Sequence, residues 1–398
     1  MAEAVIVSAV RTPIGRANKG VLKDVRADDL AAVAVKAALE RVPQLDRSLI
    51  EDLILGCAFP EGEQGMNVAR LVGALAGLPE TAGGVTVNRF CASSLQAFNM
   101  AAQNIMLGLG DVIVAGGIES MSRVPMGGFN PSMNPRLVPT REGETYSSPY
   151  PPCELEYGLS SYIPMGMTAE NLAREYKISR EAQDAFALRS HQRALAAIDQ
   201  GIFKREIAPV TLPNGRVMDT DEGPRRETSL ERLASLEPVF IKGGSVTAGN
   251  SSPLNDGASA VVVMSSEAAK AQGITPLARV ITMAVSGVNP AIMGIGPVPA
   301  VKKALQRANL QLSDIDIIEL NEAFAAQSLA VVQALGIDEE RLNPHGGAIA
   351  LGHPLGCTGA RLIATLLNDL QTANKTLGMA TLCVGGGQGV ATIIERIG

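Results

Sequence analysis

The spacing of apolar residues predicts alternating strands and helices over the first part of the chain. Short apolar or alternating runs predict four buried strands, over residues 4–9, 53–55, 85–87 and 111–115. Apolar residues at helical spacing predict three helices, over residues 28–41, 67–76 and 92–107. Gly77 and Gly108 end two of these helices, and Gly116 ends the last strand. This alternation is typical of a parallel or mixed sheet covered by helices.

The pattern changes between residues 120 and 246. Residues 120–152 are rich in Pro, Gly, Met and Ser and show no period, which predicts a long excursion from the core. A helix is expected over residues 180–200, because Ser179 can cap its start and Gly201 follows its end. His191 falls on the apolar stripe of that helix, where a lone histidine is usually packed or hydrogen-bonded. A central strand is then expected over residues 258–264.

After Thr275 the first pattern starts again, which indicates two copies of one α/β unit. Two ungapped matches in the same order support this duplication: residues 50–59 with 315–324, and residues 111–117 with 380–386. The copies differ where chemistry is expected, because Asn321 then stands opposite Gly56 and Cys383 opposite Val114. A cleft between the two copies would gather these residues with Cys91 of the first copy.

Composition narrows the class of protein. The 398 residues are enough for two or three domains, and 34 basic against 40 acidic residues argue against a nucleic-acid surface. Five cysteines, an odd number without C-x-x-C spacing, disfavour a disulfide framework or a zinc site and favour a reducing compartment.

Targeting and membrane signals are weak. No apolar run reaches the roughly 18 residues of a membrane span, and Met1 to Ile14 lack the basic region of a signal peptide. A cytoplasmic location is therefore expected. A mitochondrial matrix location stays open if a transit peptide has been removed.

Cys91 lies where a short strand meets a helix. Free backbone N–H groups at that junction would lower the pKa of the thiol and could face a developing oxyanion. A small apolar filler is the alternative role for a buried cysteine, and position alone does not decide between them.

Three segments of the second copy carry reactive side chains. Asn321 could hold a water or an oxyanion, although a helix cap is the commoner role. His353, in a loop rich in Gly and Ala, could take a thiol proton, or could be held by backbone hydrogen bonds. Cys383 precedes three glycines that allow backbone N–H groups to approach a substrate, or it ends a buried strand. A second thiol is useful where a proton moves to or from carbon.

Five motifs in this order make the chain closely resemble the thiolases over essentially its whole length: NRFCASSLQA, TAGNSSPLNDGA, NEAF, GGAIALGHPLGCTGAR and CVGGGQG. The resemblance implies an α/β fold in which duplicated halves form a five-layered α-β-α-β-α core with an inserted loop domain. It divides the chain into residues 1–121 with 252–274, a CoA-binding loop domain over 122–251, and residues 275–398.

The resemblance also implies roles for five site residues. Cys91 is the nucleophile that forms an acyl thioester, and His353 activates it. His353, with a water held by Asn321, faces the enolate oxygen. Cys383 is the acid and base for the α-carbon proton and for CoA. The backbone N–H groups of Cys91 and Gly385 form the second oxyanion hole.

Substrate binding is implied at three further positions. Ser252 matches a serine that contacts the pantetheine of CoA, and Met165 matches a residue that lines the acyl pocket. Arg225 falls at a position that often contacts the adenine-phosphate end of CoA. Biosynthetic members usually have His before that Met, and this chain has Pro164. Coenzyme A is the expected co-substrate, with no covalent cofactor and no metal.

We therefore expect a 3-ketoacyl-CoA thiolase of fatty-acid β-oxidation. A biosynthetic acetoacetyl-CoA thiolase is the nearest alternative. A decarboxylating ketoacyl synthase, using His345 and His353, and a non-catalytic acyl-CoA-binding protein are more distant ones. The resemblance further implies a homodimer or homotetramer, and a possible complex with a subunit carrying hydratase and dehydrogenase activities.

Overall fold

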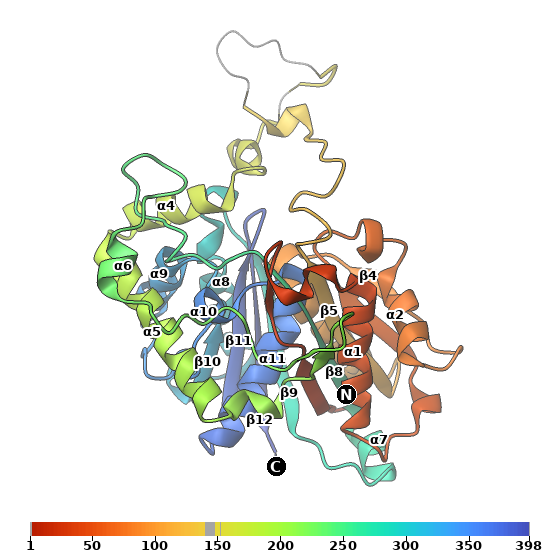
Figure 1. The fold of residues 1–398 in the computed structure, drawn as a ribbon. Helices are drawn as coiled ribbons and strands as arrows, with labels where there is room; N and C mark the ends of the chain where they lie inside the picture. The colour runs from red at the N-terminus through yellow and green to blue at the C-terminus, as the bar shows by residue number, and fades with distance from the viewer. Residues whose placement is uncertain (1, 140–147, 152, 398) are drawn as a thin grey trace.

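The computed structural model describes residues 2–139, 148–151 and 153–397 (Figure 1). The first half contains the strands β1 (Ala4–Arg11), β2 (Gly15–Arg16), β3 (Asp52–Gly56), β4 (Val85–Val87), β5 (Val112–Ser120) and β8 (Asn255–Ser265). Its helices are α1 (Ala27–Glu40), α2 (Val68–Ala76), α3 (Ser93–Met106) and α7 (Ser266–Ala271). The expected strands and helices of this half are thus confirmed, with ends shifted by a few residues.

The second half contains β9 (Ala278–Gly287), β10 (Ile317–Leu320), β11 (Leu377–Val384) and β12 (Gln388–Arg396). Its helices are α8 (Pro297–Ala308), α9 (Ala325–Leu335), α10 (Ala348–Leu351) and α11 (Leu355–Thr372). The chain between β5 and β8 of the first half contains α4 (Met165–Glu175), α5 (Arg180–Asp199), β6 (Val210–Thr211), β7 (Val217–Met218) and α6 (Leu230–Ala234).

The strands of the two halves form two sheets that meet along one short seam. Their order is β4-β3-β5-β8-β1 and then β9-β12-β11-β10, with β2 paired to β8. At the seam, β1 bonds to β9 only through the pairs Val5 with Arg279 and Ile6 with Ala278. The hydrogen bonds therefore join the two expected sheets into one sheet, which has ten strands within the described residues.

Helices form three layers around these sheets. One apolar cluster packs α1 and α2 on the first sheet, and another packs α8 and α9 on the second. Helices α3 and α11 lie between the two sheets and share a third cluster with both (Figure 1). Every residue of α11 from Leu355 to Leu370 is buried, as befits a helix with sheets on two sides. The result is the expected α-β-α-β-α order.

Strand pairing corrects part of the internal alignment. Leu55 pairs with Gly116 in the first half, and Leu320 pairs with Thr381 in the second. If Asn321 corresponds to Gly56, Thr381 must therefore correspond to Gly116. The match of residues 111–117 with 380–386 is wrong by four positions, because Cys383 corresponds to Ile118.

The error arose from glycines that serve different purposes. Strand β5 does not end at Gly116-Gly117 but continues to Ser120. A Cβ on Gly117 would lie 2.0 Å from the carbonyl oxygen of Gly356 in α11, so this glycine permits close packing. The glycines after Cys383 instead form the turn between β11 and β12.

The prediction of a buried strand over residues 85–87 was wrong in its burial. Strand β4 is bonded to β3 alone at the edge of the sheet, and Val85 is exposed. An alternating run of three residues does not distinguish an edge strand from a central one.

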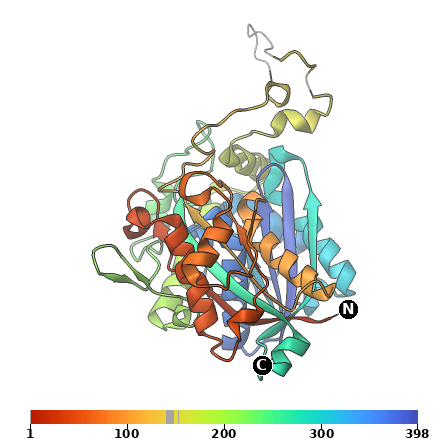
Figure 2. The ribbon, with the colours of Figure 1, turned by 90° about the vertical axis from the view of Figure 1, so that its right-hand side faces the viewer.

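Met121 and Val124 are still buried, and the described parts of residues 130–163 stand away from the sheets, above α4 (Figures 1 and 2). They contain two short 3-10 helices, Pro135–Leu137 and Glu156–Ser160, and no strand. Residues 140–147 and 152 of the expected excursion lie outside the described residues. Helix α5 begins as expected, because the Ser179 hydroxyl accepts the N–H of Ala182. Within the ranges that the structure covers, no helix is both long and apolar enough to cross a membrane.

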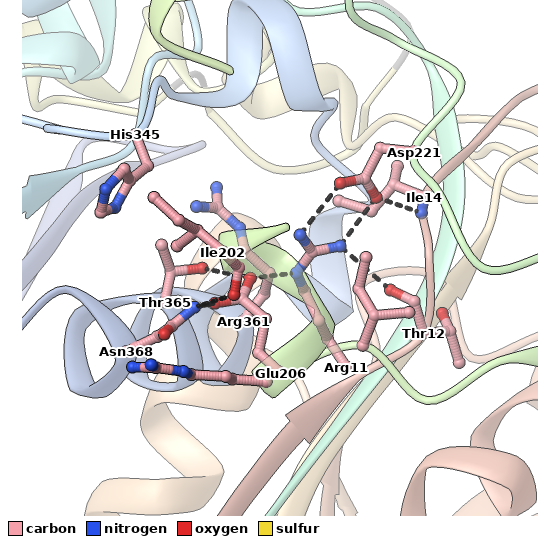
Figure 3. A network of polar contacts seen from close by, with 12 residues as sticks. Arg11, Thr12, Ile14, Ile202, Glu206, Asp221, His345, Arg361, Thr365 and Asn368 are labelled. Atoms are coloured by element: carbon pink, nitrogen blue, oxygen red, sulfur yellow. Dashed lines mark hydrogen bonds and ion pairs between the residues drawn. The ribbon is translucent and has the colours of Figure 1, made fainter. Parts of the chain in front are cut away.

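A buried network of charges links three parts of the chain (Figure 3). Arg11 of β1 is fully buried and donates to Glu206 at 2.5 Å and to both carboxylate oxygens of Asp221 at 2.7 and 2.9 Å. Glu206 also accepts from Thr365 and Asn368 of α11. Because buried charges require partners, this network ties the inserted segment to both halves.

Candidate active site

Cys91 lies in a tight turn between β4 and α3. Residues Phe90–Ala92 form one turn of 3-10 helix, and α3 begins at Ser93. Phe90 has φ of +40°, which is strained for a residue with a side chain. Its N–H donates to Asn88 Oδ1 at 2.8 Å, and its carbonyl accepts from the Ser93 hydroxyl at 2.7 Å. These two hydrogen bonds hold Phe90 in its strained conformation, and Phe90 in turn fixes the position of Cys91.

The Cys91 thiol is protonated in the resting protein. Burial raises its pKa to about 11, even though the N–H groups of Gly385 and of Cys91 itself face the sulfur and act to lower it. The expectation of a lowered pKa was therefore wrong, since desolvation of the thiolate outweighs the two N–H groups. The same two N–H groups are the donors that the resemblance assigned to an oxyanion hole.

Cys383 brings the second sulfur to this place. It lies near the end of β11 and is fully buried. Burial raises the pKa of its thiol well above the ordinary value, and the neighbouring Cys91 thiol adds to the shift. Since Gly385 lies two residues further on, the chain that carries Cys383 also supplies an N–H group to Cys91. Sulfurs from opposite halves therefore share one site.

His353 is held in the loop between α10 and α11. Its backbone N–H donates to Asn255 Oδ1 at 2.9 Å. Its Nδ1 lies 2.7 Å from the hydroxyl of Thr358, which itself donates to the carbonyl of Pro354. Because that hydroxyl has only one proton, it accepts the Nδ1–H of His353, which leaves Nε2 with a free lone pair.

The imidazole of His353 is neutral. Burial, reinforced by the positive charge of Arg361, lowers its pKa to about 3. Nε2 lies 3.3 Å from Nδ2 of Asn321, which can donate to it. A neutral imidazole with an unprotonated Nε2 is the form that accepts a proton from a thiol.

Asn321 does not cap a helix. Helix α9 begins only at Ala325, and its N-cap position is Phe324. Within the described residues the buried Oδ1 of Asn321 has no hydrogen-bond partner, while its Nδ2 faces His353. The amide therefore belongs with His353, as the resemblance implied, and its oxygen has capacity to accept a further hydrogen bond.

Met165 and Ser252 lie beside these groups. Met165 begins α4, and its sulfur would lie 3.7 Å from a Cβ on Gly385. It packs against the apolar cluster that contains Cys383 and Phe324. Ser252 donates its N–H and its hydroxyl to the carbonyl of Ala323, at 3.0 and 3.1 Å.

Arg225 lies in a different neighbourhood, next to Arg16 and α5. Its N–H donates to Nδ1 of His191 at 3.2 Å. The prediction that His191 is packed and hydrogen-bonded is confirmed. Burial, together with the charges of Arg225 and Arg16, lowers its pKa to about 4.

Three residues that support the site were not predicted from the sequence. Thr358 sets the tautomer of His353, and Asn255 holds its backbone. Glu119 is a fully buried carboxylate near the end of β5. Only Glu119 left a signal, because a charged residue in an otherwise apolar strand needs an explanation.

The arrangement suits acyl transfer. It offers one thiol faced by two N–H donors, a neutral imidazole as a base, and a second thiol for another proton.

Comparison with known proteins points the same way. Residues 4–267 match the family model for the thiolase N-terminal domain, and residues 274–396 match the model for the thiolase C-terminal domain. The chain is 49% identical over 407 residues to a 3-ketoacyl-CoA thiolase of Bacillus subtilis (strain 168), covering 99% of this chain and 100% of the relative.

Two solved structures are similar over the whole chain. The acetyl-CoA acetyltransferase of Bacillus anthracis has a TM-score of 0.89 at 43% identity, covering 100% of this chain and 99% of the other. The human mitochondrial 3-ketoacyl-CoA thiolase in complex with CoA has a TM-score of 0.88 at 42% identity, covering 100% and 98%.

Proposed function

Since the chain belongs to the thiolase family, we propose that this acyltransferase cleaves 3-oxoacyl-CoA with CoA, giving acetyl-CoA and a shortened acyl-CoA. The observation that carries the proposal is the site shared by two thiols from opposite halves, with the Gly385 N–H aimed at the Cys91 sulfur. Coenzyme A is the co-substrate, as it is the ligand of the human relative.

The first half-reaction transfers the acyl group to Cys91. His353 Nε2 takes the thiol proton, and the sulfur attacks the C3 carbonyl of the substrate. The N–H groups of Cys91 and Gly385 then face the oxyanion, and losing one such donor costs about 2.7–4 kcal/mol of barrier. The C2–C3 bond breaks, Cys383 protonates C2 of the enolate, and acetyl-CoA leaves.

The enolate requires its own stabilisation. The side chains of His353 and Asn321 lie together, and His353 carries the proton from Cys91 at that moment. His353, with a water held by Asn321, donates to the enolate oxygen. Two separate sets of donors thus serve two oxygens that develop charge at different steps.

The second half-reaction regenerates the protein. The Cys383 thiolate takes the proton of the incoming CoA thiol, and the CoA sulfur attacks the acyl thioester. Cys91 leaves as a thiolate and recovers its proton from His353. Each thiol therefore ends the cycle in its starting state.

We assign substrate contacts to Ser252, Met165 and Arg225. Met165 lies close enough to Gly385 to line the acyl pocket, and Ser252 packs on the segment that carries Asn321. Arg225, exposed beside Arg16, is a cation suited to the phosphate end of CoA. The inserted residues 122–251 then form the CoA-binding domain. Residues 1–121 with 252–274 form one half, and residues 275–398 form the other.

We further propose β-oxidation in the cytoplasm, a homodimer or homotetramer, and an optional partner with hydratase and dehydrogenase activities. The five free cysteines suit a reducing compartment. The proposals of an oligomer and of a partner subunit rest on the family resemblance alone.

A decarboxylating ketoacyl synthase fits less well. Its second histidine would have to be His345, which contacts Asp369 and the ring of Phe203. That histidine lies beside the buried charge network (Figure 3), whereas the contact of Asn321 is with His353.

The chain-length preference separates the proposal from a biosynthetic acetyltransferase. Acetyl-CoA release should be measured with CoA and a chain-length series of 3-oxoacyl-CoA substrates. We expect a higher kcat/KM on 3-oxohexadecanoyl-CoA than on acetoacetyl-CoA. A preference for acetoacetyl-CoA would favour the biosynthetic alternative, and no acylation of Cys91 by labelled acyl-CoA would leave only a binding protein.

A further inference from the structure

Glu119 is a buried carboxylate between the two catalytic segments. It has no exposed surface, although no arginine or lysine of the described residues forms an ion pair with it. Its carboxylate is instead satisfied by donors, namely the N–H groups of Ala58, Phe59 and Gly356 and the side-chain amide of Gln64. Burying a carboxylate without a paired cation costs free energy, which suggests that Glu119 has a specific role.

On one side Glu119 holds the turn that carries Cys91. Its Oε2 accepts the N–H of Ala58 at 2.8 Å. The carbonyl of Ala58 accepts from Asn88 Nδ2 at 2.8 Å, and Asn88 Oδ1 accepts the N–H of the strained Phe90 at 2.8 Å. Three consecutive hydrogen bonds therefore run from Glu119 to the residue before Cys91.

A second contact runs beside the first. Glu119 Oε1 accepts the N–H of Phe59 at 3.3 Å, and the ring of Phe59 lies against the ring of Phe90 with centroids 6.3 Å apart. Glu119 thus holds two consecutive residues that both contact the Cys91 turn.

On the other side Glu119 holds the segment that carries His353. Its Oε2 also accepts the N–H of Gly356 at 2.9 Å, across 237 positions of the chain. Gly356 is the second residue of α11, two before Thr358, which bonds to His353. A Cβ at position 356 would lie 2.3 Å from the carbonyl oxygen of Ile118, so the approach needs glycine.

We propose that Glu119 is a positioning residue that sets the Cys91 turn of one half against the His353 loop of the other. One oxygen atom, Oε2, accepts from Gly356 on the His353 side and from Ala58, which reaches the Cys91 turn through Asn88. The positions of both segments therefore depend on the same atom. The inference rests on the proposed function only for its effect on turnover. Reactions need their groups within fractions of an ångström, so loosening this joint should slow the chemistry more than it weakens binding.

The first test is Glu119→Gln, which keeps the shape and replaces one acceptor oxygen by an NH2 group that faces other donors. We expect kcat for thiolysis to fall ~10–100-fold while KM for both substrates changes less than about threefold. The matched control is Asp256→Asn. Asp256 is also a fully buried carboxylate, lies on the adjacent β8 and accepts hydrogen bonds from Ser120 and Ser122. The Asp256→Asn variant should retain the kcat of the wild type.

A double-mutant cycle tests the route. Asn88→Ala removes the link between Ala58 and Phe90. If Glu119 acts through that link, the combined variant should lose much less activity than the product of the two single losses. Losses that simply multiply, an unchanged kcat in Glu119→Gln, or an equal loss in Asp256→Asn would each overturn the proposal.

A readout without substrate keeps the inference separate from the proposed function. The alkylation rate of Cys91 with iodoacetamide should fall in Glu119→Gln, because the turn no longer holds the thiol against its N–H donors. Removing a negative charge alone would have the opposite effect, since the charge of Glu119 raises the pKa of Cys91. Equal or faster alkylation therefore refutes positioning. Slower alkylation in a protein without thiolase turnover would retain it and refute the proposed function.

Discussion

The Nδ1 atom of His353 lies 2.7 Å from the hydroxyl of Thr358, and this contact decides which imidazole nitrogen can act as a base. The Thr358 hydroxyl donates its own hydrogen bond to the carbonyl of Pro354 at 2.8 Å. His353 must therefore carry its proton on Nδ1, and Nε2 faces the side where Asn321 lies. The tautomer thus follows from Thr358, which lies five positions further along the chain in the first turn of α11.

Thr358→Val should slow turnover by removing this acceptor with little change of shape. Proton transfer by a positioned base contributes about 10²–10⁴-fold, so we expect kcat to fall roughly 100-fold. Thr358→Ser keeps the hydroxyl and is the matched control. Steady-state kinetics of thiolysis checks both variants, and full activity in Thr358→Val would contradict the tautomer assignment.

Substitution of the two thiols should separate their steps. Cys91→Ala should form no acyl-enzyme, whereas Cys383→Ser should still acylate slowly but fail to exchange the α-proton of acetyl-CoA with solvent. Intact-protein mass spectrometry detects the first, and deuterium exchange by NMR detects the second. Cys153→Ala, which changes a half-buried thiol in the inserted segment, should behave as the wild type. Normal turnover in Cys91→Ala would be incompatible with the mechanism.

The reactivity of Cys91 should rise with pH without a plateau near neutrality. Burial raises the pKa of its thiol to about 11, and only the thiolate is alkylated. The rate should therefore increase about tenfold per pH unit between pH 7 and 10. Iodoacetamide labelling followed by peptide mapping measures it, and a rate that levels off at pH 7 would show that a thiolate is already present.

Acid should destabilise the fold through histidines that are buried neutral. The pKa of His191 is lowered to about 4, below its ordinary value. The folded state thus disfavours the proton, so stability is complete above the unfolded pKa of about 6.5 and is lost as pH falls toward the folded value. His191→Asn should reduce the loss between pH 7.5 and 5 by about 2 kcal/mol. Urea unfolding at both pH values tests this, and an unchanged loss would exclude His191 as a cause.

The buried pairing of Arg11 should be essential for stability. Arg11→Leu leaves Glu206 and Asp221 without their cation, which should cost about 3–5 kcal/mol of unfolding free energy. Arg226→Leu breaks an exposed pair with Asp199 and should cause no measurable change. Parallel denaturant titrations compare the two. Similar midpoints for both variants would mean that the buried network relaxes without penalty.

Local pattern was enough to place most elements and to single out the reactive side chains. Helix α5 and its Ser179 cap, strand β8 and the helix after Cys91 all follow from periodicity and capping residues that lie close together in sequence. The duplicated unit was also visible, although its second match was out of register because glycines inside β5 resembled glycines beyond β11.

The chain by itself therefore determined which segments become strands and helices, the family motifs, and the candidates Cys91, Asn321, His353 and Cys383. Tertiary structure alone decided the protonation states of these residues and the hydrogen bonds that hold them in place. A pKa depends on desolvation and on partners from elsewhere in the chain, which is why the thiol of Cys91 proved harder to ionise than its place before a helix suggested. Glu119 reaches Gly356 across 237 positions, and no local pattern records such a contact.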